Sequence, residues 1–270
     1  MHTPLCRHAY GEPEAYAETG LRRGLAGIIV TCHNAMPESY GHAGRMRETE
    51  VGEYLTIITR CAVAYQGRLD VRIGLECDYF PGYEPHVRRQ IQQLPLEYVI
   101  GSVHPQLPIW RRRFGDDDPG QVQRNYFDQL ASAAETELFD CISHPDLIKN
   151  MTAGDWRFDE VAEHVGWCLD RIAATGVAME LNTSGRLKTL PEMNPNPPML
   201  RMMRQRNIPV VLGADAHVPE RVGDYFEQGL TLLRESGYSH VSYFLERQRR
   251  DVAIDEALAS LARDEAALSL

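Results

Sequence analysis

Short runs of β-branched and other apolar residues alternate along this chain with longer amphipathic stretches, and this alternation restricts the fold more than any other feature. The runs that predict strands are residues 25–32, 71–76, 98–103, 139–143, 177–182, 209–213 and 240–245. The stretches that predict helices are residues 48–65, 85–94, 120–136, 158–175, 199–206, 222–236 and 254–268. Strands that alternate with helices are typical of an α/β fold built from parallel βα units.

Seven such units in 270 residues favour one barrel over an open sheet, although periodicity alone leaves the open sheet possible. We find no repeat, low-complexity segment or linker that would divide the chain. Residues 1–270 are therefore predicted to form a single domain.

The predicted strands end at side chains that bind metals. His33, Glu76, His104 and His144 each stand at the end of a strand, and a further strand is followed by Asp215 and His217; His2 and His8 lie at the start of the chain. In a βα barrel the carboxyl ends of the strands converge on one face, so these side chains are expected to meet there.

Imidazoles mixed with carboxylates suit zinc, manganese or iron, and this many ligands exceed the needs of one tetrahedral ion. The pattern therefore predicts two or three divalent metal ions. Clustered ions that share a hydroxide are suited to the hydrolysis of phosphate esters. We find no glycine-rich phosphate loop, no G-x-S-x-G motif and no dinucleotide fingerprint.

Charge and hydropathy exclude several classes of protein. The formal net charge of -10 and the lack of basic and aromatic stripes disfavour nucleic acid as a partner. No apolar run approaches the roughly 20 residues that span a bilayer, and no leader pattern follows Met1, so we expect a cytoplasmic protein with reduced cysteines that does not bind membranes. The oligomeric state is not predicted.

These residues resemble the polymerase and histidinol phosphatase (PHP) family of metallophosphoesterases, and within it the monofunctional histidinol-phosphatases. The matching segments follow the family's order: HTPLCRH at 2–8, TCHN at 31–34, GLECDY at 74–79, GSVH at 101–104, SHPDL at 143–147, ELNTSG at 180–185 and GADAH at 213–217. The resemblance implies a distorted (β/α)7 TIM-like barrel that hydrolyses L-histidinol phosphate in histidine biosynthesis.

The resemblance also implies a ligand set, in which Glu76 would bridge two ions. The implied ligands are His2, His8, His33, Glu76, His104, His144, Asp215 and His217. The family's first motif is His-x-His, and its first histidine has no counterpart in Met1-His2. We therefore expect either a further ligand upstream of Met1 or a site with one ligand fewer.

The residues that handle the substrate are less sharply defined. Arg186 is our first candidate for a phosphate clamp because a guanidinium fits phosphate with two bonds, and Lys188, Lys149 and His42 are further candidates for substrate contacts. Asp215, His217 and Glu76 are the predicted catalytic residues, the first two as possible proton donors to the departing alkoxide.

Three other functions stay open at this point. The first is a phosphoesterase of the same fold that acts on another monoester or on DNA 3′ ends. The second is a metal-dependent amidohydrolase, although Glu76 stands where that class usually has a carboxylated lysine. The third is a catalytically inactive binding module.

Overall fold

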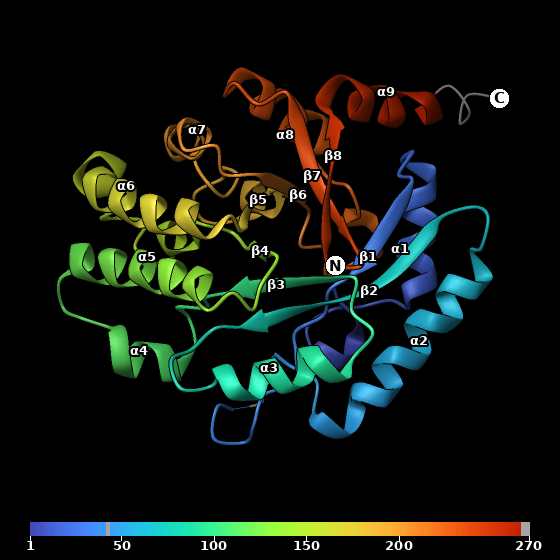
Figure 1. The fold of residues 1–270 in the computed structure, drawn as a ribbon, viewed down its shortest axis with the longest axis horizontal. Helices are drawn as coiled ribbons and strands as arrows, with labels where there is room; N and C mark the ends of the chain where they lie inside the picture. Colours follow the sequence, from blue (N-terminus) through green and yellow to red (C-terminus); the bar gives the residue numbers. More distant parts are fainter. Residues whose placement is uncertain (42–43, 266–270) are drawn as a thin grey trace.

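In a computed structural model, which describes residues 1–41 and 44–265, eight strands form one sheet in the order β1 to β8. Figure 1 shows helices packed around the outside of these strands. The strands are β1 (Gly27–Val30), β2 (Asp70–Asp78), β3 (Tyr98–Ser102), β4 (Cys141–Ile142), β5 (Ala178–Asn182), β6 (Val210–Gly213), β7 (His240–Leu245) and β8 (Gln248–Ala253). The fold is a distorted TIM-like barrel, as predicted.

Neighbouring strands from β1 to β7 pair in parallel, and each lies within or overlaps a range predicted as a strand. The helices are α1 (Pro13–Arg22), α2 (Val51–Ala64), α3 (Glu84–Gln93), α4 (Pro108–Phe114), α5 (Pro119–Glu135), α6 (Phe158–Thr175), α7 (Pro197–Gln205), α8 (Phe226–Glu235) and α9 (Ile254–Glu265). One or two helices connect each parallel strand to the next. The division of the chain into domains stays a prediction.

Strand β8 was not predicted, because its residues are mostly exposed and lack the alternation of apolar and polar side chains. It pairs antiparallel with β7 through a two-residue turn at Glu246 and Arg247, whose φ angles of 53° and 59° suit a hairpin of the primed type. The Arg247 side chain fixes this turn by donating hydrogen bonds to Asp140 and to the carbonyl of Leu138.

Helices α1 and α4 were also not predicted. In α4 a run of three arginines obscures the helical pattern of apolar residues in the sequence, although Trp110 on the apolar face is buried against the core. In α1 a proline occupies the first turn, where its missing N–H costs nothing, and Tyr16 and Ala17 are buried.

Alternation along the strands explains where the core ends and the polar site begins. Inside the barrel one buried cluster consists of Tyr98, Ile100, Cys141, Ala178, Val211 and Phe244. Two residues further along three of these strands, on the same inward face, stand Ser102, Ser143 and Glu180. The interior therefore changes from apolar to polar toward the carboxyl ends of the strands.

The other core lies between the sheet and the helices. It includes Val99 of β3 on the opposite face from Ile100, together with Phe127 and Leu130 of α5. Within the described residues no helix is both long and apolar enough to cross a membrane.

Close packing at one glycine gives a prediction about stability. A Cβ atom on Gly101 of β3 would clash with the Phe139 ring, whereas one on Gly52 of α2 would meet nothing within 4 Å. We expect Gly101→Ala to lower the free energy of unfolding by about 1 to 3 kcal/mol through overpacking. Gly52→Ala is the control and should not destabilise the protein. Equal denaturation midpoints for both variants and the parent would contradict this packing.

Candidate metal centre

The eight side chains predicted as ligands lie together at the carboxyl ends of the strands. Glu76 belongs to β2, and the others stand just after strands or in the first nine residues of the chain. They form one connected group through contacts between side chains: His2, His8, His33, Glu76, His104, His144, Asp215 and His217. Their role as metal ligands is a proposal that this proximity supports.

Glu76 is the centre of the group and is only 5% exposed. Its Oε2 lies 3.3 Å from Nε2 of His2 and 3.8 Å from Nδ1 of His33. Its Oε1 lies 3.3 Å from Nε2 of His104 and 3.4 Å from Nε2 of His144. The two oxygens of one carboxylate thus face two different pairs of imidazoles, an arrangement that suits a ligand shared between ions.

Backbone pairing places His2 beside Glu76. The amide of Thr31, just after β1, donates to the carbonyl of Met1 at 2.9 Å, and the amide of His2 donates to the carbonyl of Ala216 at 3.0 Å. The first two residues therefore lie between the extensions of β1 and β6. The short helix η1 (Pro4–Cys6) then turns the chain so that His8 returns to the same group.

Asp215, His217 and His8 form the more open side of the group. Asp215 Oδ1 lies 3.0 Å from Nε2 of His2 and 3.5 Å from Nδ1 of His217. The Nε2 atoms of His217 and His8 are 2.9 Å apart. Two ring nitrogens at this distance need a proton or another cation between them.

An unpaired buried nitrogen supports the fit of the group to metal ions. Nδ1 of His33 faces Oε2 of Glu76 at 3.8 Å and is buried with no hydrogen-bond partner among the described residues. Leaving a buried polar atom unpaired is costly, and coordination would satisfy it. Nitrogen and carboxylate donors gathered at this density, with ligand atoms of His33, Glu76 and His104 within 4.8 Å of one another, are those that zinc-like ions use.

The protonation of several members also suits coordination. Burial opposes ionisation of Glu76, but the surrounding histidines, His33 first, outweigh it and hold the pKa of Glu76 well below its usual range. Burial lowers the pKa of His33 well below its ordinary value and, with the charge of His2, lowers the pKa of His217 to about 4. Near neutral pH Glu76 is therefore ionised and His33 and His217 are neutral, the forms that bind metals. Burial opposes protonation of His2 and His104, but neighbouring carboxylates outweigh it and raise their pKa values, so both would release a proton when they bind an ion.

Asp78 contacts the ring nitrogen of His104 that faces away from Glu76, a role that the sequence analysis missed. Asp78 is fully buried, lies 2.5 Å from Nδ1 of His104 and accepts a hydrogen bond from the buried Arg45. Burial opposes protonation of His104, but the Asp78 carboxylate outweighs it and raises the pKa of His104 to about 9. This contact directs Nε2 of His104 toward Glu76. The sequence did contain a signal for this role, because Asp78 follows Glu76 by two positions and therefore lies on the same face of the strand.

Glu180 supports His144 in a similar way and was likewise missed. His144 has a φ of 24°, which is unfavourable for a residue with a side chain. Glu180 Oε2 accepts from the amide of His144 at 2.9 Å, and the Tyr126 hydroxyl donates to the carbonyl of His144 at 3.0 Å. These bonds hold the peptide of His144 in a conformation that points its ring at Glu76.

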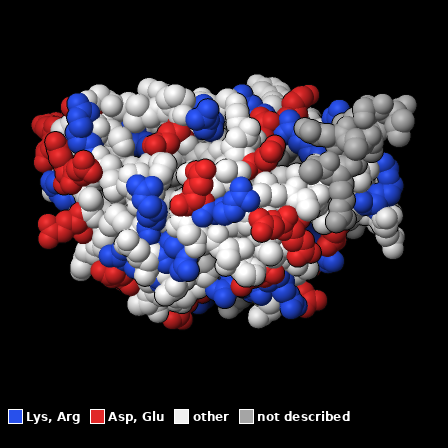
Figure 2. Space-filling view, turned by 90° about the horizontal axis from the view of Figure 1, so that it is seen from above, with Lys and Arg blue, Asp and Glu red and all other residues white. Residues whose placement is uncertain are grey.

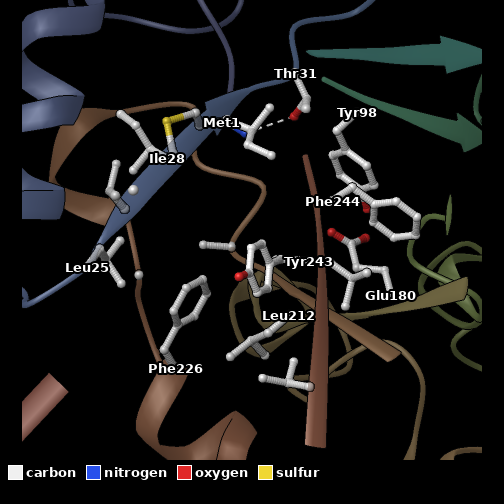
Figure 3. A pocket seen from close by; sticks show the side chains of 18 of the residues that line it. Met1, Leu25, Ile28, Thr31, Tyr98, Glu180, Leu212, Phe226, Tyr243 and Phe244 are labelled. Carbon is white, nitrogen blue, oxygen red and sulfur yellow. Dashed lines mark hydrogen bonds between the residues drawn. The ribbon is translucent and has the colours of Figure 1, made fainter. Parts of the chain in front are cut away.

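A cavity of about 630 Å³ adjoins the group and is lined by strand residues and by His2, Glu76, His144 and Asp215. Figure 3 shows the Glu180 carboxylate in it near Phe244 and Tyr98, with Met1 donating to Thr31 at one edge of the cavity. Burial raises the pKa of Glu180. The polar residues that line the cavity include His2, Glu76, His144 and Asp215, so the polar side of the cavity adjoins the candidate metal centre.

Of the predicted phosphate contacts that the structure describes, Lys188 lies nearest the group. Its Nζ is 4.0 Å from Asp215 Oδ2, and its side chain is 28% exposed. Arg186 is exposed, donates to the carbonyl of Pro191 at 3.4 Å and lies over the Tyr225 ring. The structure brings Lys188 to the group but gives Arg186 no contact with it.

Lys149 is a correction to the sequence analysis. Its side chain is fully buried, and Nζ donates to Asp146 at 3.1 Å, to Glu192 at 3.1 Å and to the carbonyl of Met193 at 2.8 Å. All three ammonium hydrogens are used, so Lys149 anchors a loop instead of clamping phosphate. His42, and any ligand upstream of Met1, lie outside the described residues.

The amino-acid sequence is similar to one protein family and to several of its relatives. The family model described as PHP domain matches residues 1–184. The chain is 37% identical over 250 residues to a probable histidinol-phosphatase of Deinococcus radiodurans, covering 90% of this chain and 94% of the relative. It is 26% identical over 265 residues to the histidinol-phosphatase of Bacillus subtilis, covering 84% and 95%.

Solved structures show the same fold. The histidinol phosphate phosphatase of Lactococcus lactis, in complex with zinc, L-histidinol and phosphate, superposes with a TM-score of 0.78 at 19% identity, covering 93% of this chain and 97% of that one. A protein of Listeria monocytogenes described as a histidinol phosphatase gives 0.75 at 18% identity, covering 84% and 97%.

The support of His104 by Asp78 gives a prediction about metal affinity. We expect Asp78→Asn to weaken zinc binding by about 10- to 100-fold, because the charge that orients the imidazole is lost. Asp70→Asn, at the exposed start of the same strand, is the matched control. Competition with a metallochromic chelator measures both affinities, and circular dichroism checks that the variants fold. Zinc affinity unchanged in a folded Asp78→Asn variant would refute this role.

Proposed function

The chain belongs to the PHP domain family, and we propose that it hydrolyses L-histidinol phosphate to L-histidinol and phosphate with the help of divalent metal ions. Relatives that it matches over most of their length are named histidinol-phosphatases. The observation that carries the proposal is the position of Glu76, whose two oxygens each face a pair of histidines.

Two or three ions of zinc, manganese or iron are the proposed cofactors. Glu76 would be shared between ions, and the remaining seven side chains of the group would complete their coordination. Bound ions of this class lower the pKa of water and neutralise charge on phosphoryl oxygens. The zinc in the Lactococcus lactis structure supports zinc among these three metals.

Lys188 is the proposed contact for the phosphate. Its ammonium group stands beside Asp215 at the open side of the group and is partly exposed, so it can reach an incoming phosphate oxygen. Arg186 lies two residues away in the same segment and is retained as a second clamp, which would need its side chain to leave Tyr225.

Hydrolysis joins a water oxygen to phosphorus, breaks the bond between phosphorus and the histidinol oxygen, and delivers a proton to that oxygen. The attacking water releases a proton, and we assign its transfer to that oxygen to Asp215 or His217, both of which are unprotonated near neutral pH. His217 is the more accessible, since the two side chains are 15% and 27% exposed. Ser184 Oγ donates to Asp215 Oδ2 at 3.2 Å, which fixes one carboxylate oxygen.

Surface charge supports a small substrate over a nucleic acid. Figure 2 shows lysines and arginines interspersed with acidic residues on the face it presents, without a broad basic patch. With a net charge of -10, the protein lacks the field that a phosphate backbone requires. A cytoplasmic location stays a prediction.

Substrate and metal dependence can be tested in one assay. We expect phosphate release from L-histidinol phosphate to exceed release from other monoesters and from an oligonucleotide 3′-phosphate. A chelator should abolish the activity, and added zinc or manganese should restore it. Comparable rates across the panel would reject the proposed substrate, while full activity in chelator would reject the metal mechanism.

The contact assigned to Lys188 gives a separate prediction. We expect Lys188→Met to lower kcat/KM by about 10- to 100-fold, the effect of losing a hydrogen bond to a charged group. Arg201→Met, an exposed residue of α7, is the control. Steady-state kinetics on both variants provides the measurement, and kcat/KM of Lys188→Met equal to that of the control would remove Lys188 from the site.

A further inference from the structure

A second group of metal-binding side chains lies outside the barrel, between α5 and α6. Asp128 projects from α5, and His164 and Cys168 stand four residues apart on α6. Residues at this spacing share one face of a helix, so both side chains point toward Asp128. Figure 1 shows α5 and α6 side by side on the outside of the fold.

The three ligand atoms are close enough to share an ion. His164 Nε2 lies 3.0 Å from Asp128 Oδ1, Cys168 Sγ lies 3.5 Å from the same oxygen, and all three atoms lie within 4.8 Å of one another. We propose that Asp128, His164 and Cys168 form a second site for a zinc-like transition metal, which links α5 to α6. One nitrogen, one sulfur and one oxygen ligand make up a donor set that such ions accept.

Burial gives this group an open side and a closed side. The side chains of Asp128 and His164 are 36% and 25% exposed, whereas Cys168 is 1% exposed. An ion can therefore enter from solvent past Asp128 and His164 and reach the thiol behind them. Solvent can supply the remaining ligand.

The nearest cation does not oppose this site strongly. Arg171 lies 3.8 Å from Asp128 Oδ1, but its guanidinium donates two hydrogen bonds of 2.7 Å to Glu135. Glu135 therefore balances the charge of Arg171, and the carboxylate of Asp128 remains available to an incoming cation.

Binding would proceed with release of the thiol proton. Burial, and then the charge of Asp128, raise the pKa of Cys168 to about 12, so the thiol is protonated when no metal is bound. A metal replaces this proton, because coordination deprotonates a thiol outright. The sulfur–hydrogen bond is exchanged for a sulfur–metal bond without any change of oxidation state.

Trp167 provides a local signal for the test. It is 54% exposed, and its ring centroid lies 5.7 Å from that of His164. A paramagnetic ion such as Co²⁺ bound to His164 should therefore quench its fluorescence.

The experiment titrates metal-free protein with Co²⁺ and follows three signals: equivalents bound, Trp fluorescence and the sulfur-to-cobalt charge-transfer band. We expect His164→Gln and Cys168→Ser each to bind one equivalent less than the parent and to lose fluorescence quenching. Cys168→Ser should also lose intensity in the charge-transfer band. His240→Gln, which changes a histidine in β7, is the matched control and should behave like the parent.

Phosphatase activity separates this proposal from the proposed function, because His164→Gln should retain the parent's rate. The new side-chain amide in that variant can still donate to Asp128, which keeps the test available if Cys168→Ser is destabilised. The same number of Co²⁺ equivalents and the same quenching in the parent and His164→Gln would overturn the second site, whatever the activity assay shows.

Discussion

An ionised carboxylate inside a protein is stable only when positive charge or hydrogen-bond donors compensate for the water it has lost. Glu76 is such a group, because it is 5% exposed and surrounded by four imidazoles and the Ser102 hydroxyl. Those imidazoles come from the ends of β1, β3 and β4 and from the first residues of the chain. The barrel must bring these ends together for the carboxylate to be tolerated, so fold and site depend on one interaction.

The sequence was sufficient to predict the parallel strands and the side chains at their ends. In a buried parallel strand both faces are apolar, so a polar residue marks the point where the strand leaves the core, as at His33 and His104. Strand β8 and helix α4 were missed because exposed and charged residues dominate them, and their positions depend on contacts such as that of Arg247 with Asp140. Local sequence does not encode such contacts.

The residues that hold the histidines in position could be identified only from the structure. Asp78 and Glu180 are ordinary carboxylates in the sequence, and only the fold shows that one directs the ring of His104 while the other fixes the peptide of His144. Lys149 shows the opposite case, because a lysine near a predicted ligand suggested a phosphate contact and instead donates to three acceptors of the protein itself. Sequence identifies which residue types lie near a site, whereas burial and partners decide what each one does.

Anomalous diffraction from crystals soaked with zinc and phosphate would test the central claim most directly, because it locates the ions without reference to activity. Our account predicts two or three zinc ions among the eight side chains, with Glu76 in contact with more than one of them and phosphate beside Lys188. A single ion that does not contact Glu76, or zinc located only elsewhere on the protein, would contradict it.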